Sequence, residues 1–125
     1  MNTPSNLKYA KSDEWFDPAS GKVGITDYAQ NQLSDIVFVE IFVAEGDVVE
    51  AGKAIASVES VKASSEIFAP ASGTVSAVNK DLPQKPEGLN SDPFGASWMI
   101  QIEGGVAGDM MDAAAYVAYC ESRSH

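Results

Sequence analysis

Short hydrophobic runs, each ended by a turn rich in Gly or Pro, are the feature that most restricts how this chain folds. The strongest run is 35–43, where the β-branched and aromatic residues that start at Ile36 are interrupted only by Glu40. Turn sequences at 45–47 and 51–53 separate further short runs. Several short strands at this spacing predict a mostly β fold, either a sandwich or a flattened barrel.

The rest of the chain adds short helices and loops to this pattern. Thr26 and Asp27 are good N-cap residues and predict a short helix that follows them. Three consecutive alanines favour a C-terminal helix that packs at one end of the fold. The predicted elements are a strand running into a turn over 8–15, a strand over 23–25, a helix over 28–33, a short extended segment at 48–49, a turn at 70–73, a strand over 74–78, a long loop over 81–94, a strand over 97–103 with Trp98, Ile100 and Ile102 on one face, and a helix over 112–120.

The chain is expected to form one domain that spans residues 1–125. A length of 125 residues is enough to bury a single core without disulfides or metals. The polar ends, 1–6 and 121–125, are predicted to be N-terminal and C-terminal tails.

Lys62 lies between two predicted strands, 54–61 and 65–69. Two strands joined by a short connection are typical of a β-hairpin, so Lys62 is predicted at its tip, displayed to solvent on a rigid support. Such a display suits a lysine that an enzyme must select among several for attachment of a prosthetic group.

The charge balance argues against two classes of binding partner. Eighteen acidic residues against eight basic ones give a formal charge of −10. Nucleic acids and anionic membranes are bound by clustered Lys and Arg, so neither is expected as a partner. An acidic surface could instead steer the protein toward basic patches on partner enzymes, or could simply serve solubility.

Few residues are available for catalysis or metal binding. The single cysteine, Cys120, excludes an intrachain disulfide and is predicted to be a buried thiol on the C-terminal helix rather than a reactive one. The single histidine, His125, lies in the predicted tail, so no Cys/His metal cluster and no Ser/His/Asp triad is expected. Trp15 and Trp98 are predicted to pack in the core.

The N-terminal residues bear on the expected location. Residues 1–6 have neither the basic and apolar regions of a secretory leader nor an Arg-rich transit pattern, and no run of about 18 apolar residues predicts a membrane span. The protein is therefore expected to be cytoplasmic and of the bacterial type, without a presequence.

A series of motifs in one order and spacing extends from Leu7 to Cys120. With these motifs the chain resembles the H-protein family of the glycine cleavage system, through 7–9 with Glu14-Trp15, 23–30, 36–40, 45–52, Val58-Glu59-Ser60-Val61-Lys62-Ala63, 69–73, Val78-Asn79, 90–95 and Trp98-Met99. The resemblance implies a mostly β fold, the lipoyl/biotinyl-type flattened β-barrel sandwich with short helices and a C-terminal helix.

The same resemblance implies a non-catalytic carrier. Lipoic acid is joined to the Lys62 amine as an amide, and the resulting arm shuttles an aminomethyl group from the PLP-dependent glycine decarboxylase (P protein) to the tetrahydrofolate-dependent aminomethyltransferase (T protein). Dihydrolipoamide dehydrogenase (L protein) re-oxidises the arm. A lipoate ligase, or an octanoyltransferase with lipoyl synthase, attaches the group. A monomer is expected because the carrier must present one arm to several enzymes.

Two carboxylates are candidates for a pocket that receives the arm. The loaded arm ends in an amine that is cationic near neutral pH, so a shielding pocket is expected to offer carboxylates. Glu14 is a candidate because the family motif around it lies beside the arm, and Glu66 because it follows Lys62 by four residues on the returning strand. Both could equally be solvated surface acids.

Departures from the family pattern keep a second function open. Asp13 and Tyr28 stand where the family usually has histidines. They leave room for an H-like lipoyl-relay module that passes lipoate to other acceptor proteins. An enzyme in its own right is disfavoured because no nucleophile–base pair is present. Biotin carriage is disfavoured because Val61 and Ala63, rather than methionines, flank Lys62.

Overall fold

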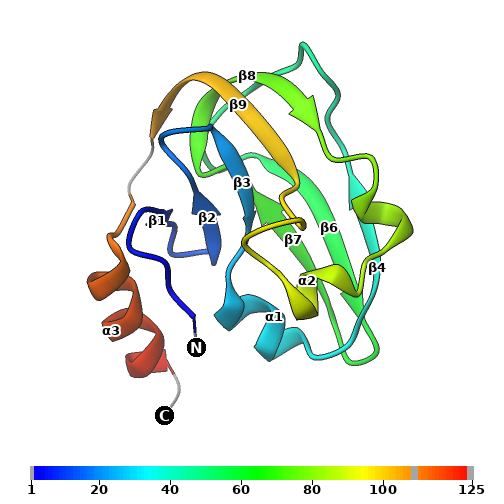
Figure 1. The fold of residues 1–125 in the computed structure, drawn as a ribbon, viewed down its shortest axis with the longest axis vertical. Helices are drawn as coiled ribbons and strands as arrows, with labels where there is room; N and C mark the ends of the chain where they lie inside the picture. Colours follow the sequence, from blue (N-terminus) through cyan, green and yellow to red (C-terminus); the bar gives the residue numbers. More distant parts are fainter. Residues whose placement is uncertain (1, 108–109, 124–125) are drawn as a thin grey trace.

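The computed structural model describes residues 2–107 and 110–123 of the chain. The described residues form nine strands and four short helices (Figure 1). The strands are β1 (Lys8–Tyr9), β2 (Glu14–Phe16), β3 (Lys22–Ile25), β4 (Ile36–Ile41), β5 (Val48–Val49), β6 (Ala54–Ser60), β7 (Ser64–Phe68), β8 (Ala71–Val78) and β9 (Ile100–Ala107). The helices are α1 (Asp27–Leu33), the 3₁₀ helix η1 (Leu82–Gln84), α2 (Gly88–Ser91) and α3 (Ala113–Arg123).

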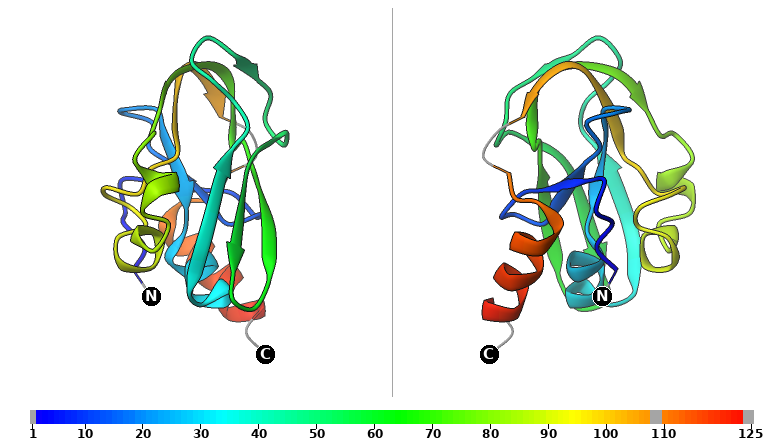
Figure 2. Two further views of the ribbon diagram at one scale, coloured as in Figure 1. Left: turned by 90° about the vertical axis from the view of Figure 1, so that its right-hand side faces the viewer. Right: turned by 60° about the vertical axis from the view of Figure 1, so that its left-hand side comes forward.

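Two antiparallel sheets form the body of the molecule. The larger has the order β1-β2-β3-β9-β8-β5, and the smaller has the order β4-β6-β7. Figure 2 shows the two sheets as facing layers, with α3 beside the N-terminal strands. The predicted mostly β, flattened sandwich with short helices and a C-terminal helix is confirmed. No helix in the described part of the chain is long and apolar enough to cross a membrane.

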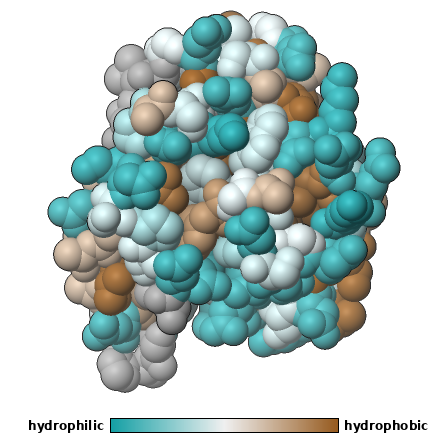
Figure 3. All heavy atoms as spheres, viewed as in Figure 1, coloured by the Kyte–Doolittle hydropathy of each residue, from teal (hydrophilic) through white to brown (hydrophobic). Residues whose placement is uncertain are grey.

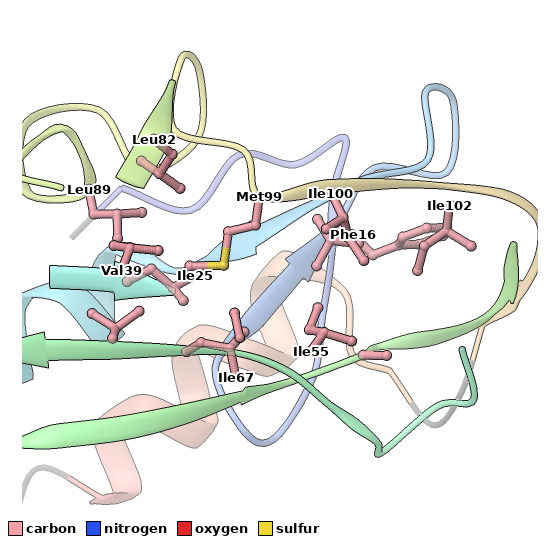
Figure 4. Packing of buried hydrophobic residues seen from close by; sticks show 14 of the residues in the cluster. Phe16, Ile25, Val39, Ile55, Ile67, Leu82, Leu89, Met99, Ile100 and Ile102 are labelled. Carbon is pink, nitrogen blue, oxygen red and sulfur yellow. The ribbon is translucent and has the colours of Figure 1, made fainter. Parts of the chain in front are cut away.

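The main core lies between the two sheets. Val39, Ile55 and Ile67 point inward from the smaller sheet and pack against Ile25 and Ile100 of the larger one (Figure 4). Each of these side chains is at most 3% exposed, and burial of one such aliphatic side chain contributes roughly 1.5–3 kcal/mol. This core fixes the position of the β6–β7 hairpin on which Lys62 lies.

A second, smaller core holds α3 against the first two strands. The rings of Tyr9 and Tyr116 stack with 4.8 Å between their centroids. Trp15 is 2% exposed, and its indole Nε1 donates to the Pro93 carbonyl over 2.9 Å. Cys120, also 2% exposed, packs in the same cluster. The predicted burial of Trp15 and Cys120 is thus confirmed.

Gly24 shows how tightly the β2 tryptophan is packed. A Cβ atom at this position would lie 2.7 Å from the Trp15 Nε1 atom, closer than non-bonded atoms approach. Only glycine therefore lets β3 lie directly beneath the indole ring.

One N-terminal expectation needs a correction. The segment 8–15 is not one strand running into a turn, because Lys8–Tyr9 and Glu14–Phe16 pair with each other as an antiparallel hairpin. Residues 2–6 of the predicted N-terminal tail form no strand or helix, and two hydrogen bonds tie them to the fold. The Asn2 N–H donates to Asp27 over 2.6 Å, and the Tyr9 hydroxyl donates to the Pro4 carbonyl over 2.6 Å.

The predicted long loop over 81–94 is in fact partly helical and anchored. It contains η1 and α2, and each places one leucine, Leu82 or Leu89, in the main core. The prolines suggested irregular structure, but Pro83 occupies the first turn of η1, where a missing N–H costs nothing.

The later strands and the last helix are longer than predicted. Residues 71–73 belong to β8 rather than to a turn, because Gly73 pairs with Val49. The strand predicted over 97–103 begins at Ile100 and continues through the two glycines at 104–105. Trp98 consequently lies in the smaller core and is half-buried, whereas Met99 is fully buried in the main core. Helix α3 extends through Arg123, so the predicted C-terminal tail begins within it.

A β-bulge leaves part of β4 apolar on the outside. The register between β4 and β6 shifts between Ile36 and Phe38, so Val37 and Phe38 both face solvent, 54% and 45% exposed. Figure 3 shows a largely hydrophilic face, with hydrophobic atoms gathered along the edge where β4 runs.

Candidate functional site

The turn between β6 and β7 is held together by one serine. The Ser60 hydroxyl accepts from the backbone N–H groups of Lys62 and Ala63 over 3.2 and 3.0 Å, and it donates to the Ala63 carbonyl over 3.1 Å. The Ser60 N–H also donates to the Ala63 carbonyl over 2.8 Å. Serine side chains are known to organise turns in this way, a signal that the sequence interpretation did not use.

Lys62 projects from this turn into solvent. Its side chain is exposed, as are those of its neighbours Val61 and Ala63. The Val61 N–H donates to the Asp35 carbonyl over 3.1 Å, which ties the tip to the start of β4. Figure 1 shows the β6–β7 hairpin ending at the lower edge of the molecule, beside the connection from α1 to β4. The site therefore combines an accessible amine with an anchored backbone.

Replacing Ser60 by alanine is expected to loosen the tip without unfolding the domain. The loss of hydrogen bonds from one turn hydroxyl is expected to cost about 1 kcal/mol. Amide hydrogen exchange at Lys62 and Ala63 should accelerate, while exchange in the core of β6 stays slow. Ser65→Ala, which removes an exposed hydroxyl on the returning strand, is the matched control. Equal exchange at the tip in both variants would show that Ser60 does not hold it.

A groove begins next to the tip on the outer side of the hairpin. It has a volume of about 530 Å³. Its lining comes from β6 and β7: Ser57, Glu59, Ser64, Ser65, Glu66 and Phe68. From Ser64 to Phe68 the strand covers roughly 13 Å. A flexible chain attached at Lys62 therefore has a path along β7, lined by carboxylates and hydroxyls.

Glu66 lies on the open side of this groove. It pairs with Ser57 across the hairpin, and its side chain is exposed. The carboxylate is thus solvated, and the structure gives it no hydrogen-bond partner among the described residues.

Glu14 lies in a different environment, between the two sheets. Its side chain has no exposed surface. One carboxylate oxygen accepts from the Ser12 hydroxyl, and the other accepts from the Phe68 N–H over 3.1 Å. Burial, the largest effect, together with the nearby Asp13, raises the pKa of Glu14 from 4.5 to about 7, although the two hydrogen bonds act in the opposite direction.

Phe68 is the residue that relates the two predicted carboxylates to each other. Its side chain lines the groove with Glu66, whereas its backbone N–H binds Glu14. Near the end of β7 one acid, Glu66, is therefore solvated, and the other, Glu14, is buried against the backbone. Sequence reasoning did not identify Phe68, because its contact with Glu14 depends on how β2 and β7 approach each other. Ser12 was also missed, although it lies only two residues before Glu14 and could have been found from that spacing.

Asp13 and Tyr28, the two departures from the family pattern, share one partner. The Arg123 guanidinium forms a two-point ion pair with Asp13, with distances of 2.5 and 3.1 Å. It also lies over the Tyr28 ring, 4.4 Å from the centroid. Arg123 was assigned to the C-terminal tail from the sequence, so this contact was not foreseen. His125 lies outside the described residues.

Comparison with known proteins yields a match over nearly the whole chain. The family model described as "Glycine cleavage H-protein" matches residues 7–123. The glycine cleavage system H protein of Deinococcus radiodurans is 49% identical over 116 residues, which cover 93% of this chain and 95% of that protein. The H protein of Deinococcus deserti is 51% identical over 119 residues, with 94% and 98% covered. The crystal structure of an H protein from Mycobacterium marinum superposes with a TM-score of 0.85 at 32% identity and covers 98% of this chain and 99% of that one.

Proposed function

Since this chain belongs to the glycine cleavage H-protein family, we propose that it is a non-catalytic carrier with a lipoyl group on Lys62. In this role it accepts an aminomethyl group at glycine decarboxylase and delivers it to the tetrahydrofolate-dependent aminomethyltransferase. Dihydrolipoamide dehydrogenase then restores the oxidised form. We propose that the protein acts as a monomer in the cytoplasm.

The observation that carries this proposal is the display of Lys62 on an ordered turn beside an acidic groove. An enzyme that attaches a lipoyl group needs an accessible amine, and the Lys62 side chain is exposed. It also needs the amine in a reproducible position, which the Ser60 hydrogen bonds provide. The residues present therefore fit the group.

The lipoyl group would supply a dithiol–disulfide pair that accepts electrons and a carbon fragment at sulfur. Everything else in the proposed role comes from the chain itself. Tethering at Lys62 raises the effective concentration of the carried group at each partner enzyme, and it does so without a new contact.

The acids have separate proposed tasks in holding a cationic arm. Glu66 attracts the terminal amine into the groove from the solvent side, where the attraction is weak and screened by salt. Glu14 then binds it more strongly, because a charge-assisted hydrogen bond gains strength in a buried site. For an amine to reach Glu14, the Ser12 or Phe68 contact must open, since Glu14 has no exposed surface.

A raised pKa suits Glu14 to this task. Near neutral pH the carboxyl of the unloaded protein is partly protonated, because its pKa is about 7. An adjacent ammonium favours the ionised carboxylate, so binding of the loaded arm is expected to draw Glu14 into its charged form. The pocket thereby avoids an uncompensated buried charge while the arm is elsewhere.

Exchange of bicarbonate with the carboxyl carbon of glycine tests the proposed function. Lipoylated protein is expected to support this exchange with a glycine decarboxylase whose competence is established with its own H protein. The unlipoylated chain is the control and should support none. Absence of exchange by the lipoylated chain would contradict the proposal. If a transferase then moves lipoate from Lys62 to the lysine of another protein, the lipoyl-relay function replaces the proposed role in glycine cleavage.

A further inference from the structure

Arg123 links the C-terminal helix to the turn that precedes Glu14. From the last turn of α3, its guanidinium reaches Asp13 through two hydrogen bonds and lies over the rings of Tyr28 and Tyr119, 4.4 and 4.3 Å from their centroids. A planar guanidinium is suited to two-point binding of a carboxylate and to stacking on aromatic rings. The side chain is thus held by Asp13 and Tyr28 from two other segments and by Tyr119 of its own helix.

Asp13 is held in an unusual backbone conformation. Its φ is +76°, in the left-handed region that favours glycine, asparagine and aspartate. Its N–H donates to the Ala10 carbonyl over 3.0 Å, and its carbonyl accepts from the Thr26 N–H over 3.0 Å. The Tyr116 hydroxyl donates to its carboxylate over 2.8 Å. Backbone and side chain are therefore fixed together, with α3 supplying both side-chain donors.

The residues on either side of Asp13 belong to the site around Glu14. Ser12 precedes it and donates to the Glu14 carboxylate, and Glu14 itself follows it. A rotation about the backbone of Asp13 would turn Ser12 away from Glu14, because the three residues are consecutive. The pair formed by Asp13 and Arg123 therefore adjoins both pocket residues in the chain.

The pair also controls the charge near Glu14. Of the described groups that act on this carboxyl, the Ser12 hydroxyl and the backbone N–H groups of Phe68 and of Glu14 itself are uncharged donors, and Asp13 is the charged one. Asp13 disfavours ionisation of Glu14 and thus raises its pKa. Arg123 neutralises Asp13, so its removal should strengthen the repulsion between the two acids.

We propose that Arg123 is a positioning residue for the arm pocket: through Asp13 it holds Ser12 and Glu14 in the arrangement that receives the amine-terminated arm. This inference rests on the proposed carrier function. It also explains the two departures from the family pattern together, because Asp13 and Tyr28 each contact Arg123.

The first test follows the titration of Glu14 by carboxyl ¹³C NMR in the unmodified chain, so it does not depend on lipoylation. Arg123→Gln is expected to raise the titration midpoint of Glu14 by roughly half a pH unit or more, since Asp13 loses its counterion. Lys85→Gln removes the same charge from an exposed side chain and is the matched control. Equal midpoints in the two variants would overturn the proposal.

A double variant tests whether Arg123 acts through Asp13. In an Asp13→Asn background the charge that Arg123 neutralises is absent, so Arg123→Gln should leave the Glu14 midpoint where Asp13→Asn alone places it. Circular dichroism and thermal unfolding identify any variant that fails to fold. A further shift in the double variant would show that Arg123 acts on Glu14 directly and would overturn the stated route.

The second test measures retention of the arm in the lipoylated protein. After loading with glycine and glycine decarboxylase, the isolated Arg123→Gln variant is expected to release ammonia several-fold faster at pH 7 than Lys85→Gln. Equal release rates would contradict the positioning role. If wild-type protein takes no lipoate at all, the carrier function fails, whereas the NMR result still decides whether Arg123 positions Glu14.

Discussion

Lys62→Arg is expected to abolish lipoylation and, with it, all carrier activity. Amide formation needs a nucleophilic neutral amine, which lysine supplies, whereas the guanidinium of arginine stays protonated and delocalised. The substitution preserves charge and approximate length at an exposed position, so the free energy of unfolding should change by less than about 0.5 kcal/mol. The substitution should therefore remove the attachment of lipoate at residue 62 and leave the fold unchanged.

Intact and peptide-level mass spectrometry measures this outcome directly. The wild-type chain, co-expressed with a lipoate ligase and supplied with lipoate, should gain one lipoyl increment that maps to Lys62. Lys53→Arg, at another exposed lysine in the turn before β6, is the control and should still gain the lipoyl group at Lys62. A lipoyl increment on the Lys62→Arg variant would place the attachment elsewhere. No increment on the wild type, with a known acceptor modified in the same cells, would contradict the carrier class.

Glu14→Gln is expected to remove a large pH dependence from the stability of the protein. The carboxyl has a pKa of about 7 in the folded chain and an ordinary value of 4.5 when unfolded. A raised folded-state pKa gives stability that is fully present below pH 4.5 and lost as the pH rises to about 7. This loss is about 3 kcal/mol in the wild type and absent in the variant.

Glutamine suits the comparison because it keeps both hydrogen bonds. Its amide oxygen can accept from the Phe68 N–H, and its amide group can donate to the Ser12 hydroxyl, which then acts as acceptor. Urea unfolding at pH 4 and pH 8 measures the effect. The free energy of unfolding of the variant, relative to that of the wild type, should be higher at pH 8 than at pH 4. If the free energy of unfolding depends on pH in the same way in both proteins, the pKa of Glu14 is not raised.

The effects of Glu14→Gln on stability and on retention of the arm are expected to have opposite signs. Glu14→Gln should gain stability at pH 8 and still accept lipoate at Lys62, because the tip lies at the other end of β7. It should retain a loaded arm less well, since it has lost the buried carboxylate. A residue that reduces stability at working pH yet serves the proposed pocket is an instance of a functional group kept at a cost to the fold.

Local patterns were sufficient for most of the secondary structure. The run that starts at Ile36, the N-cap at Thr26 and the strands around Lys62 predicted β4, α1 and the hairpin, because each depends on neighbours in the sequence. The errors occurred where tertiary contacts override local preference. The segment 81–94 looked irregular from its prolines, but burial of Leu82 and Leu89 stabilises two short helical turns.

The sequence by itself determined the mostly β class, the exposed hairpin with Lys62 and, through ordered motifs, the family. These features depend on residues close together in the chain or on motif order. Only the tertiary structure decided which acid is buried, because the burial of Glu14 follows from the approach of β2 to β7, 54 residues apart at the Phe68 contact. It likewise decided that Arg123 meets Asp13 across 110 residues. Contacts of that range leave no local pattern, since they arise from how the two sheets and α3 pack together.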